Sequence, residues 1–388
     1  MPKGALKIIN ILKNAGFSAY AVGGCVRDSV MGKTPSDWDI TTSACPEIMT
    51  ELFSANGIAA IPTGIKHGTV SAVVGDSVYE CTTYRTESGY SDSRHPDIVS
   101  FSQKLEDDLC RRDFTVNAMA YAPGTDIVDL FGGMSDIERR IIRTVGDARE
   151  RFREDALRIL RAIRFACTLG FEIEKNTLSA ARDCREGLSK ISAERKTEEL
   201  RKILLSEDPD YGILLLFESE LENFILPELK KPRVSLKNSP DMFEARLALL
   251  VSDSPNAELR RLRLSNKELR NVTLLLEKPS SELSEINARN ILKKYGDLAG
   301  IVCRNYGYYE LDRLVCLEKE KNPCVCLASL EIDGNDLKTL GVPQKAIGAV
   351  LNRLLDEVIA DPRLNSKECL RGIAMNIYAN ILNNNSSM

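Results

Sequence analysis

The spacing of apolar and polar residues changes character near residue 140, and this change divides the chain into two parts. In the first part, segments with helical spacing are interleaved with short runs in which apolar and polar residues alternate one by one, as in strands. Predicted helices cover residues 4–15, 26–31, 46–54 and 105–121. Predicted strands cover residues 18–22, 38–42, 69–74, 77–84 and part of 126–133. Two of these strands flank Gly75-Asp76, which favours a hairpin turn, so we expect a mixed α/β domain with one sheet over residues 1–140.

The rest of the chain is predicted to be almost entirely helical. From Asp147 onward, strand-like runs nearly vanish and apolar residues recur at the spacing of a helix. Segments with this spacing include residues 155–169, 175–185, 193–205 and 211–220. A chain of 388 residues exceeds what a single core usually supports, so we expect several domains.

One stretch in the first part, GGCVRDSVMGKTPSDWD, combines residue types that bind phosphate and metal. Gly23 and Gly24 follow a predicted strand, and glycines let backbone N–H groups approach phosphates closely. Arg27 can clamp a phosphate oxygen. Asp37 and Asp39 are two residues apart on a predicted strand, so their carboxylates face the same side and repel each other unless a cation lies between them. Mg²⁺, which prefers carboxylate and phosphate oxygens, is the expected cofactor.

Each of these features alone has a simpler explanation. A glycine pair or an Asp-x-Asp motif is often only a solvated turn, and it is their order that favours a binding site. Glu80 lies in the middle of a predicted strand of the same sheet. It is either a third metal-binding carboxylate or an exposed residue at the sheet edge.

A second group of polar residues lies at the start of a predicted helix in the second part. Asp155 and Arg158 are three residues apart and share a face, along which Arg161 and Arg164 continue. The other faces are mostly apolar, so this stripe lines something polar such as a cleft; the alternative is an ion pair on a solvated helix. A carboxylate beside a guanidinium can accept from the exocyclic amine of cytosine or adenine and donate to the adjacent ring nitrogen. Guanine and uracil would reverse both contacts, so this pair could select C and A.

Composition excludes several classes of protein. The net charge of −4 excludes a globally basic nucleic-acid coat, although basic clusters remain at residues 139–164 and 260–270. Eleven cysteines without zinc-like spacing predict a reducing, cytoplasmic location. Two histidines are too few for an added hydrolase domain built on His and Asp metal ligands. No apolar run approaches about 18 residues, so no membrane span is expected, and the sequence indicates no protein partner.

A series of ordered sequence blocks resembles the class II tRNA nucleotidyltransferases, the CCA-adding enzymes, which have bacterial poly(A) polymerases as close relatives. The blocks are VGGCVRD, SDWDITTSA, YRTESGYSDSRHP, RRDFTVNAMA, DLFGG, EDALRILRAIRFA and ISAERKTEEL, and they span residues 20–205 in the order of the family. The resemblance implies an α+β fold with a polymerase-beta-like nucleotidyltransferase head at residues 1–140. A helical neck for base recognition (141–210), a helical body (211–275) and a helical tail that binds tRNA (276–388) would follow.

The resemblance also implies roles for individual residues. Asp37 and Asp39 match the catalytic, metal-binding pair of the family, with Glu80 as a possible third carboxylate. The implied nucleotide contacts are Gly24 and Arg27 for the triphosphate, Arg112 and Asp113 for the ribose, Asp155 and Arg158 for the base, and Arg161 and Arg164 in support.

The implied reaction is the addition of C, C and A to the 3′ end of tRNA from CTP and ATP, without a nucleic-acid template and with release of pyrophosphate by two-metal catalysis. An enzyme that adds only A, or a poly(A) polymerase, is the alternative.

The full-length segment YRTESGYSDSRHP, expected to be a mobile element that helps the switch from C to A, argues against a CC-only enzyme. The segment TGIKHGTVSAVV looks more like the CCA-adding type than the polyadenylating type. A catalytically silent RNA-binding protein on this scaffold would be expected to have lost a carboxylate, and both Asp37 and Asp39 are present.

Overall fold

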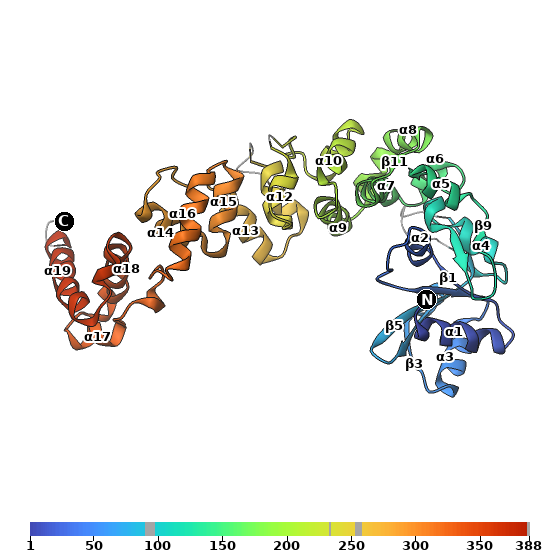
Figure 1. Ribbon diagram of the computed structural model, residues 1–388, viewed down its shortest axis with the longest axis horizontal. Helices are drawn as coiled ribbons and strands as arrows, with labels where there is room; N and C mark the ends of the chain where they lie inside the picture. The colour runs from blue at the N-terminus through green and yellow to red at the C-terminus, as the bar shows by residue number, and fades with distance from the viewer. Residues whose placement is uncertain (90–97, 233, 253–257, 386–388) are drawn as a thin grey trace. The chain divides into compact units, whose positions relative to one another are not determined.

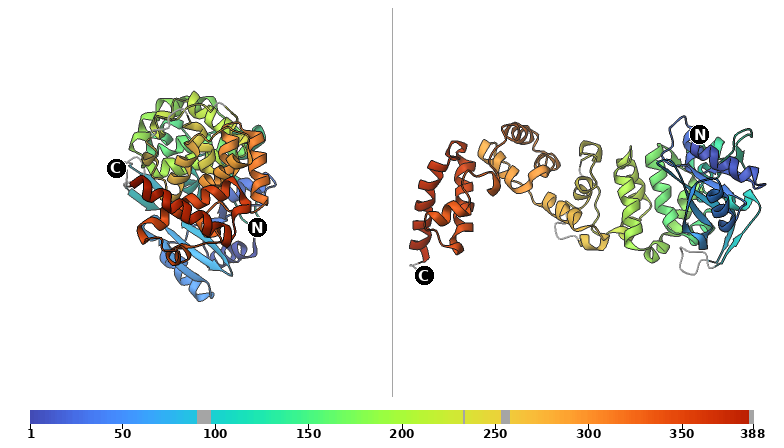
Figure 2. Two further views of the ribbon diagram at one scale, coloured as in Figure 1. Left: turned by 90° about the vertical axis from the view of Figure 1, so that its left-hand side faces the viewer. Right: turned by 90° about the horizontal axis from the view of Figure 1, so that it is seen from below.

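The computed structural model describes residues 1–89, 98–232, 234–252 and 258–385. The chain divides into a first unit, Met1–Lys231 with Glu258–Leu264, and a second unit, Pro232–Ala257 with Ser265–Met388. Within the described residues every strand belongs to the first unit, as the arrows in Figure 1 and Figure 2 show. The predicted division into head, neck, body and tail is finer than these two units and stays a prediction.

A seven-stranded mixed sheet forms the N-terminal part of the first unit, with the strand order β3-β4-β5-β2-β1-β8-β9. Its strands are β1 (Ala19–Val22), β2 (Asp39–Thr42), β3 (Ala59–Gly64), β4 (Thr69–Val74), β5 (Ser77–Thr83), β8 (Met119–Tyr121) and β9 (Val128–Asp129). Strands β2 and β5 run parallel, with Ile40 beside Cys81, and all other neighbours run antiparallel. The predicted mixed sheet is confirmed, as is the hairpin that β4 and β5 form around Gly75-Asp76.

The two faces of this sheet have different neighbours. Helices α1 (Lys3–Asn14) and α3 (Pro46–Ala55) bury their apolar residues in one cluster with Ile40 of β2. Burial of each large aliphatic side chain in such a cluster contributes about 1.5–3 kcal/mol. Because side chains alternate along a strand, Asp39 and Thr41 point to the opposite face. Helix α4 (Leu105–Cys110) packs there, with Leu109 against Val22 of β1.

The predicted helix over residues 105–121 is wrong. Only α4 is an α-helix; it is followed by a 3₁₀ turn, η2 (Thr115–Asn117), and then by strand β8. The side chain of Asp113 accepts from the backbone N–H of Phe114 at 2.9 Å, which stabilises a turn instead of a continued helix. Beyond the turn, the apolar run of β8 pairs with β1, and such a short run cannot be distinguished from a buried helix by its spacing.

Two smaller differences concern the site. The predicted strand at residues 38–42 begins only at Asp39, so Asp37 precedes β2. The segment at residues 84–96, predicted as a polar mobile loop, begins with a strand, β6 (Arg85–Ser88), which pairs with β7 (Ile98–Phe101). Residues 90–97 lie outside the described residues, so the predicted mobile element is not tested.

The rest of the first unit is helical, as predicted. Its helices are α2 (Gly24–Val30), α5 (Gly133–Arg139), α6 (Ala148–Glu154), α7 (Leu157–Leu169), α8 (Lys175–Asp183), α9 (Ala193–Leu204), α10 (Pro209–Glu218) and α11 (Glu222–Ile225). The two-residue strands β10 (Ile141–Ile142) and β11 (Glu172–Ile173) pair in parallel. The predicted helix at residues 155–169 begins only at Leu157, which leaves Asp155 at the junction of α6 and α7.

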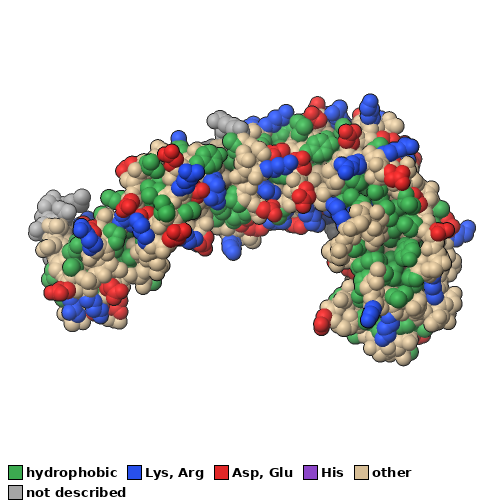
Figure 3. Space-filling view, viewed as in Figure 1, with side chains coloured by type: hydrophobic (Ala, Val, Ile, Leu, Met, Phe, Trp, Pro, Cys, Tyr) green, Lys and Arg blue, Asp and Glu red, His purple; other side chains and the backbone are tan. Residues whose placement is uncertain are grey.

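The second unit consists of helices within its described residues. They are α12 (Phe243–Leu250), α13 (Asn266–Leu276), α14 (Glu285–Tyr295), α15 (Ala299–Asn305), α16 (Tyr309–Glu320), α17 (Gly334–Thr339), α18 (Gln344–Ala360) and α19 (Lys367–Asn385). On the face drawn in Figure 3, basic and acidic side chains are interspersed over the helical part of the chain. Among the described residues, none of the helices has the length and apolar character needed to cross a membrane.

Candidate active site

A tight turn between β1 and α2 is built from the glycine pair. Gly23 has a φ of +83°, a conformation that residues with a Cβ rarely adopt. A Cβ at this position would also lie 3.0 Å from a terminal guanidinium nitrogen of Arg112. The backbone N–H of Gly23 donates to the carbonyl of Met119 at 3.2 Å, which ties the turn to β8. Glycine is therefore required here both for the backbone angle and for the approach of Arg112.

Arg27 follows this turn on α2 and is held in place from three sides. Its guanidinium donates to Asn117 Oδ1 at 2.7 Å and pairs with Asp28 at 2.7 Å. The ring of Phe165 lies 5.3 Å from its guanidinium carbon. Arg27 is only 9% exposed, so its position is fixed before any ligand arrives.

The acidic pair lines the same cavity as the glycine turn and Arg27. Asp37 and Asp39 line a cavity of about 390 Å³ together with Gly24, Arg27 and Arg112. Both aspartates are exposed, and Ser36 Oγ donates to Asp37 at 3.1 Å.

The carboxyl of Asp39 lies in a region of excess negative charge. Partial burial raises its pKa above the usual range; Arg112 opposes this, whereas Glu80 and Asp37 add to it. Glu80 lies on β5 directly beside Asp39, one residue before the parallel pair of Ile40 and Cys81. The described residues contain no group of three or more His, Cys, Asp or Glu side chains that could hold a metal. The role of Glu80 as a third carboxylate stays a prediction.

Asp113 lies deeper and is fully engaged by protein donors. Its Oδ2 accepts from two guanidinium nitrogens of Arg161 at 2.8 and 2.5 Å, and its Oδ1 accepts from the side chain of Asn117 at 3.3 Å. Burial alone would raise the pKa of Asp113, but Arg161 and these hydrogen bonds lower it to about 2. The carboxylate is therefore ionised at neutral pH and fixes the guanidinium of Arg161.

An aromatic ring lies beneath three of the arginines. Phe165 on α7 has the guanidinium carbons of Arg164 and Arg161 4.0 and 5.5 Å from its ring centre, in addition to that of Arg27. Arg164 also pairs with Glu199 on α9 at 2.7 Å. Stacked guanidinium groups keep their N–H donors directed outward from the ring, toward the cavity.

A second, smaller cavity of about 260 Å³ adjoins the first. Arg112, Asp113 and Arg161 line both cavities. The second cavity also contains Asp155 and Arg158, the pair predicted to read the base.

Asp155 and Arg158 do not pair with each other, so the alternative of an ion pair between them is wrong. Asp155 accepts from Arg195 at 2.8 Å and from the backbone N–H of Leu157 at 3.0 Å. Arg158 pairs with Glu154 at 2.7 Å and donates to the carbonyl of Arg111 at 3.2 Å. The structure therefore brings both residues to one cavity, each oriented by a different partner.

Several residues of these cavities were not predicted from the sequence. They are Asn117, Phe165, Arg111 and Arg195, and Glu199, which pairs with Arg164 beside the first cavity, was not predicted either. Asn117 and Phe165 lie inside the blocks RRDFTVNAMA and EDALRILRAIRFA, and a polar residue within the apolar TVNAMA run is the signal that could have drawn attention to Asn117. One buried nitrogen of Arg195 and one of Arg112 have no hydrogen-bond partner in the described part of the chain.

Comparisons with known proteins agree with this geometry. Residues 19–143 match the family described as the poly(A) polymerase head domain, and residues 170–231 match a probable RNA- and SrmB-binding site of polymerase A. The CCA-adding enzyme of Lactobacillus delbrueckii subsp. bulgaricus is 38% identical over 389 residues, which cover 94% of this chain and 96% of that enzyme. That of Enterococcus faecalis is 36% identical over 391 residues, covering 96% and 95%.

A solved structure supports the same relationship. The crystal structure of the Bacillus stearothermophilus CCA-adding enzyme in complex with CTP superimposes with a TM-score of 0.84 at 31% identity, covering 99% of this chain and all of that one. The α+β architecture predicted from the sequence, a mixed-sheet N-terminal region followed by helices, is confirmed. The chain thus belongs to the CCA-adding enzymes, the class II nucleotidyltransferases of the poly(A) polymerase family.

Proposed function

We propose that this nucleotidyltransferase adds C, C and A in turn to the 3′ end of tRNA, using CTP and ATP without a nucleic-acid template and releasing pyrophosphate. The observation that carries the proposal is the pair of adjoining cavities. One contains the glycine turn, Arg27 and the acidic pair, and the other contains an aspartate and an arginine suited to a base edge.

The residues shared by the two cavities suggest how a nucleotide lies. The sugar of a nucleotide joins its base to its triphosphate, so residues that line both cavities are placed to contact the sugar. Arg112, Asp113 and Arg161 occupy that position; the guanidinium of Arg161 is held by Asp113, and we assign Arg112 and Asp113 to the ribose side. Gly24 and Arg27 then face the triphosphate, where a fixed guanidinium offers donors to phosphate oxygens. Arg161 and Arg164, held by Asp113 and Glu199, add positive charge to this side.

Base selection follows from the second cavity. Asp155 can accept from the exocyclic amine of cytosine or adenine while Arg158 donates to the neighbouring ring nitrogen. Arg195 holds Asp155 in place, and Glu154 holds Arg158. Because neither side chain is free to turn, a base with the opposite order of donor and acceptor would leave buried polar groups without hydrogen-bond partners. We expect this arrangement to accept C and A and to reject G and U.

The acidic pair fits a divalent cation. Asp37 and Asp39 supply oxygen ligands at the edge of the triphosphate cavity. The pKa of Asp39 is raised mainly by partial burial, with Glu80 and Asp37 adding to the effect, and a bound cation would oppose this shift. Magnesium, when bound there, supplies positive charge to the phosphates and lowers the pKa of the attacking hydroxyl group. Glu80 remains a candidate for a supporting electrostatic role.

Two further parts of the proposal concern the partner and the location. We assign tRNA contacts to residues 276–388, where helices with basic side chains can follow a phosphate backbone. All eleven cysteines are free, which supports a reducing, cytoplasmic environment.

The test is incorporation of separately labelled CTP and ATP into tRNA that lacks its last three nucleotides. We expect two C residues from CTP alone, no A from ATP alone, and a single A once C and C are present. No incorporation from CTP, together with addition of a single A to tRNA that already ends in CC, would indicate an A-adding enzyme, and long A tails would indicate a poly(A) polymerase. Either result would contradict the proposed specificity.

A further inference from the structure

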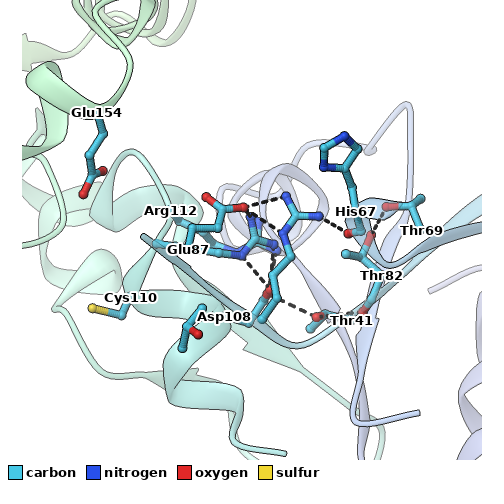
Figure 4. A network of polar contacts seen from close by, with 12 residues as sticks. Thr41, His67, Thr69, Thr82, Glu87, Asp108, Cys110, Arg112 and Glu154 are labelled. Carbon is cyan, nitrogen blue, oxygen red and sulfur yellow. Dashed lines mark hydrogen bonds and ion pairs between the residues drawn. The ribbon is translucent and has the colours of Figure 1, made fainter. Parts of the chain in front are cut away.

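A buried carboxylate, Asp108 on α4, lies behind the two cavities at the centre of a polar network (Figure 4). Asp108 is 0% exposed, and both of its carboxylate oxygens accept hydrogen bonds. Oδ1 accepts from two nitrogens of Arg111 at 3.0 and 2.6 Å. Oδ2 accepts from Arg112 at 3.1 Å and from Thr41 Oγ1 at 3.1 Å.

Arg112 depends on this carboxylate for its position. Within the described residues, Asp108 is the carboxylate with which Arg112 forms an ion pair, and its Nε has no hydrogen-bond partner. Another of its nitrogens lies over Gly23, in the turn that lines the first cavity. Asp108 therefore fixes one end of the guanidinium of Arg112, a residue that lines both cavities.

The same carboxylate connects Arg112 to the strand that carries the acidic pair. Thr41 lies on β2 two residues after Asp39, on the same face of the sheet. Its hydroxyl lies within hydrogen-bond distance of both Asp108 and the carbonyl of Thr82 on β5. The guanidinium of Arg112 is thus held at a defined place relative to Asp39.

The network also reaches the β6–β7 hairpin. Arg111 contacts Glu87 at 3.2 Å, and Glu87 pairs with Arg85 at 2.7 Å. Burial alone would raise the pKa of Asp108, but Arg112 and Arg111 lower it, so the group is ionised at neutral pH.

A purely structural role does not explain this arrangement well. Burying the carboxylate of Asp108 beside two partly buried guanidinium groups has a large desolvation cost, and apolar residues of similar volume often stabilise a protein as much or more. The network does, however, place a guanidinium with open donors at the wall shared by both cavities.

We infer that Asp108 is a positioning residue that holds Arg112 against the sugar of the bound nucleotide and thereby sets the preference for ribonucleotides over 2′-deoxyribonucleotides. This assignment rests on the proposed function, since it needs Arg112 at the ribose. Asp108 does not itself touch the substrate; it acts through the orientation of Arg112.

The test compares ATP with dATP on tRNA that ends in CC. In Asp108→Asn, one carboxylate oxygen becomes an NH₂ group, which cannot accept from Arg112 or Arg111. We expect kcat/KM for ATP to fall about 10- to 100-fold, as for the loss of one charge-assisted hydrogen bond, and kcat/KM for dATP to fall much less. The ATP/dATP preference should narrow accordingly. Asp107→Asn, which changes the neighbouring carboxylate that binds Ser102, should leave the preference unchanged.

A double-mutant cycle separates positioning from general damage. In an Arg112→Ala background, Asp108→Asn should have little further effect on the ATP/dATP preference, because the group that it positions is already absent. Additive effects, or an unchanged preference in folded Asp108→Asn protein, would overturn the assignment.

Two further outcomes keep the test decisive. If Asp108→Asn does not fold, Asp108→Glu keeps the charge but displaces it by one methylene; a narrowed preference supports the assignment and an unchanged one overturns it. If the wild-type chain extends tRNA but shows no preference for ATP over dATP, only the role of Asp108 and Arg112 fails. If the wild-type chain does not extend tRNA at all, the proposed function fails and the assignment fails with it.

Discussion

The two adjoining cavities use carboxylates in opposite ways. Asp37 and Asp39 in the first cavity are exposed, and in the described residues their carboxylates have no basic ion-pair partner. Asp113 and Asp155 at the second cavity are largely buried, and each is held by an arginine, at 2.5 and 2.8 Å. The first pair is left open for an incoming cation, whereas the second pair is already neutralised and serves to orient other groups.

This difference predicts different consequences of mutation. Removing an open carboxylate should impair the reaction and spare the fold, because no buried basic partner loses its counter-charge. Removing a paired carboxylate should impair recognition and stability together, because it leaves a buried arginine without its counter-charge. The following experiments test that contrast.

The largest effect is expected for Asp37→Ala. Loss of a cation ligand removes several kcal/mol of charge stabilisation from the transition state, so nucleotide incorporation should fall by about 10³-fold or more. Thermal stability and tRNA binding in a gel-shift assay should stay close to wild type. The matched control is Asp76→Ala, an exposed aspartate in the β4–β5 turn. Near-normal turnover in Asp37→Ala would refute the assignment of the acidic pair.

A smaller effect, directed at specificity, is expected for Asp155→Asn. The amide can no longer act as a pure acceptor toward an exocyclic amine, and the counter-charge of Arg195 is lost. We expect kcat/KM for CTP and ATP to fall about 10²-fold, while the low rates with GTP and UTP change little. Measuring all four nucleotides on one tRNA gives the discrimination ratio. The control is Asp183→Asn, which breaks the exposed ion pair with Arg149. If kcat/KM of Asp155→Asn fell equally for all four nucleotides, a role of Asp155 in base selection would be contradicted.

How far the sequence predicted this site depends on how local each contact is. Gly23 to Asp39 lie within one short stretch, so their combined chemistry was visible from residue order alone. Asn117, Phe165 and Arg195 act through contacts across tens of residues, such as that between Arg195 and Asp155, and no local pattern specifies these.

The fold shows the same limit. Hydrophobic spacing predicted the sheet-forming strands β1, β4 and β5 and the helical second part, but it predicted a helix where the chain forms α4, a turn and β8. The strand assignment of β8 depends on its pairing with β1, which is a tertiary contact. The helix predicted at residues 155–169 likewise begins only at Leu157, and Asp155 before it forms a tertiary contact with Arg195 on α9.

The pH dependence of the free energy of unfolding tests the role of a paired carboxylate, Asp113. The pKa of Asp113 is lowered to about 2 in the folded protein, so its ionised form contributes stability at any pH above its unfolded pKa of about 3.9. Asp113→Asn should therefore lower the free energy of unfolding by about 2 kcal/mol at pH 7, as monitored by the fluorescence of Trp38, the single tryptophan.

The pH profile provides the check on that prediction. The stability difference between wild type and Asp113→Asn should be constant from pH 7 to about 5 and should shrink as the pH falls from about 4 toward 2, where wild-type Asp113 becomes protonated. Asp76→Asn, at an exposed turn, should show no comparable difference at any pH. A difference that grows on acidification would have the wrong sign for a carboxylate held by Arg161.

The smallest effect is expected for Phe165→Leu, which tests whether the arginines need their aromatic support. Leucine keeps an apolar side chain beneath Arg27, Arg161 and Arg164 but removes the π face, worth about 0.5–2 kcal/mol for a partly desolvated guanidinium. Nucleotide binding should weaken about 3- to 10-fold in KM with little change in kcat, because the ion pairs of Arg161 with Asp113 and of Arg164 with Glu199 remain. The control for loss of a cation–π contact outside the cavities is Phe217→Leu. The ring of Phe217 on α10 lies 5.8 Å from the ammonium nitrogen of Lys231. If Phe165→Leu left KM unchanged, the carboxylates alone would account for the positions of these arginines, and the contrast between open and paired carboxylates would suffice to explain the site.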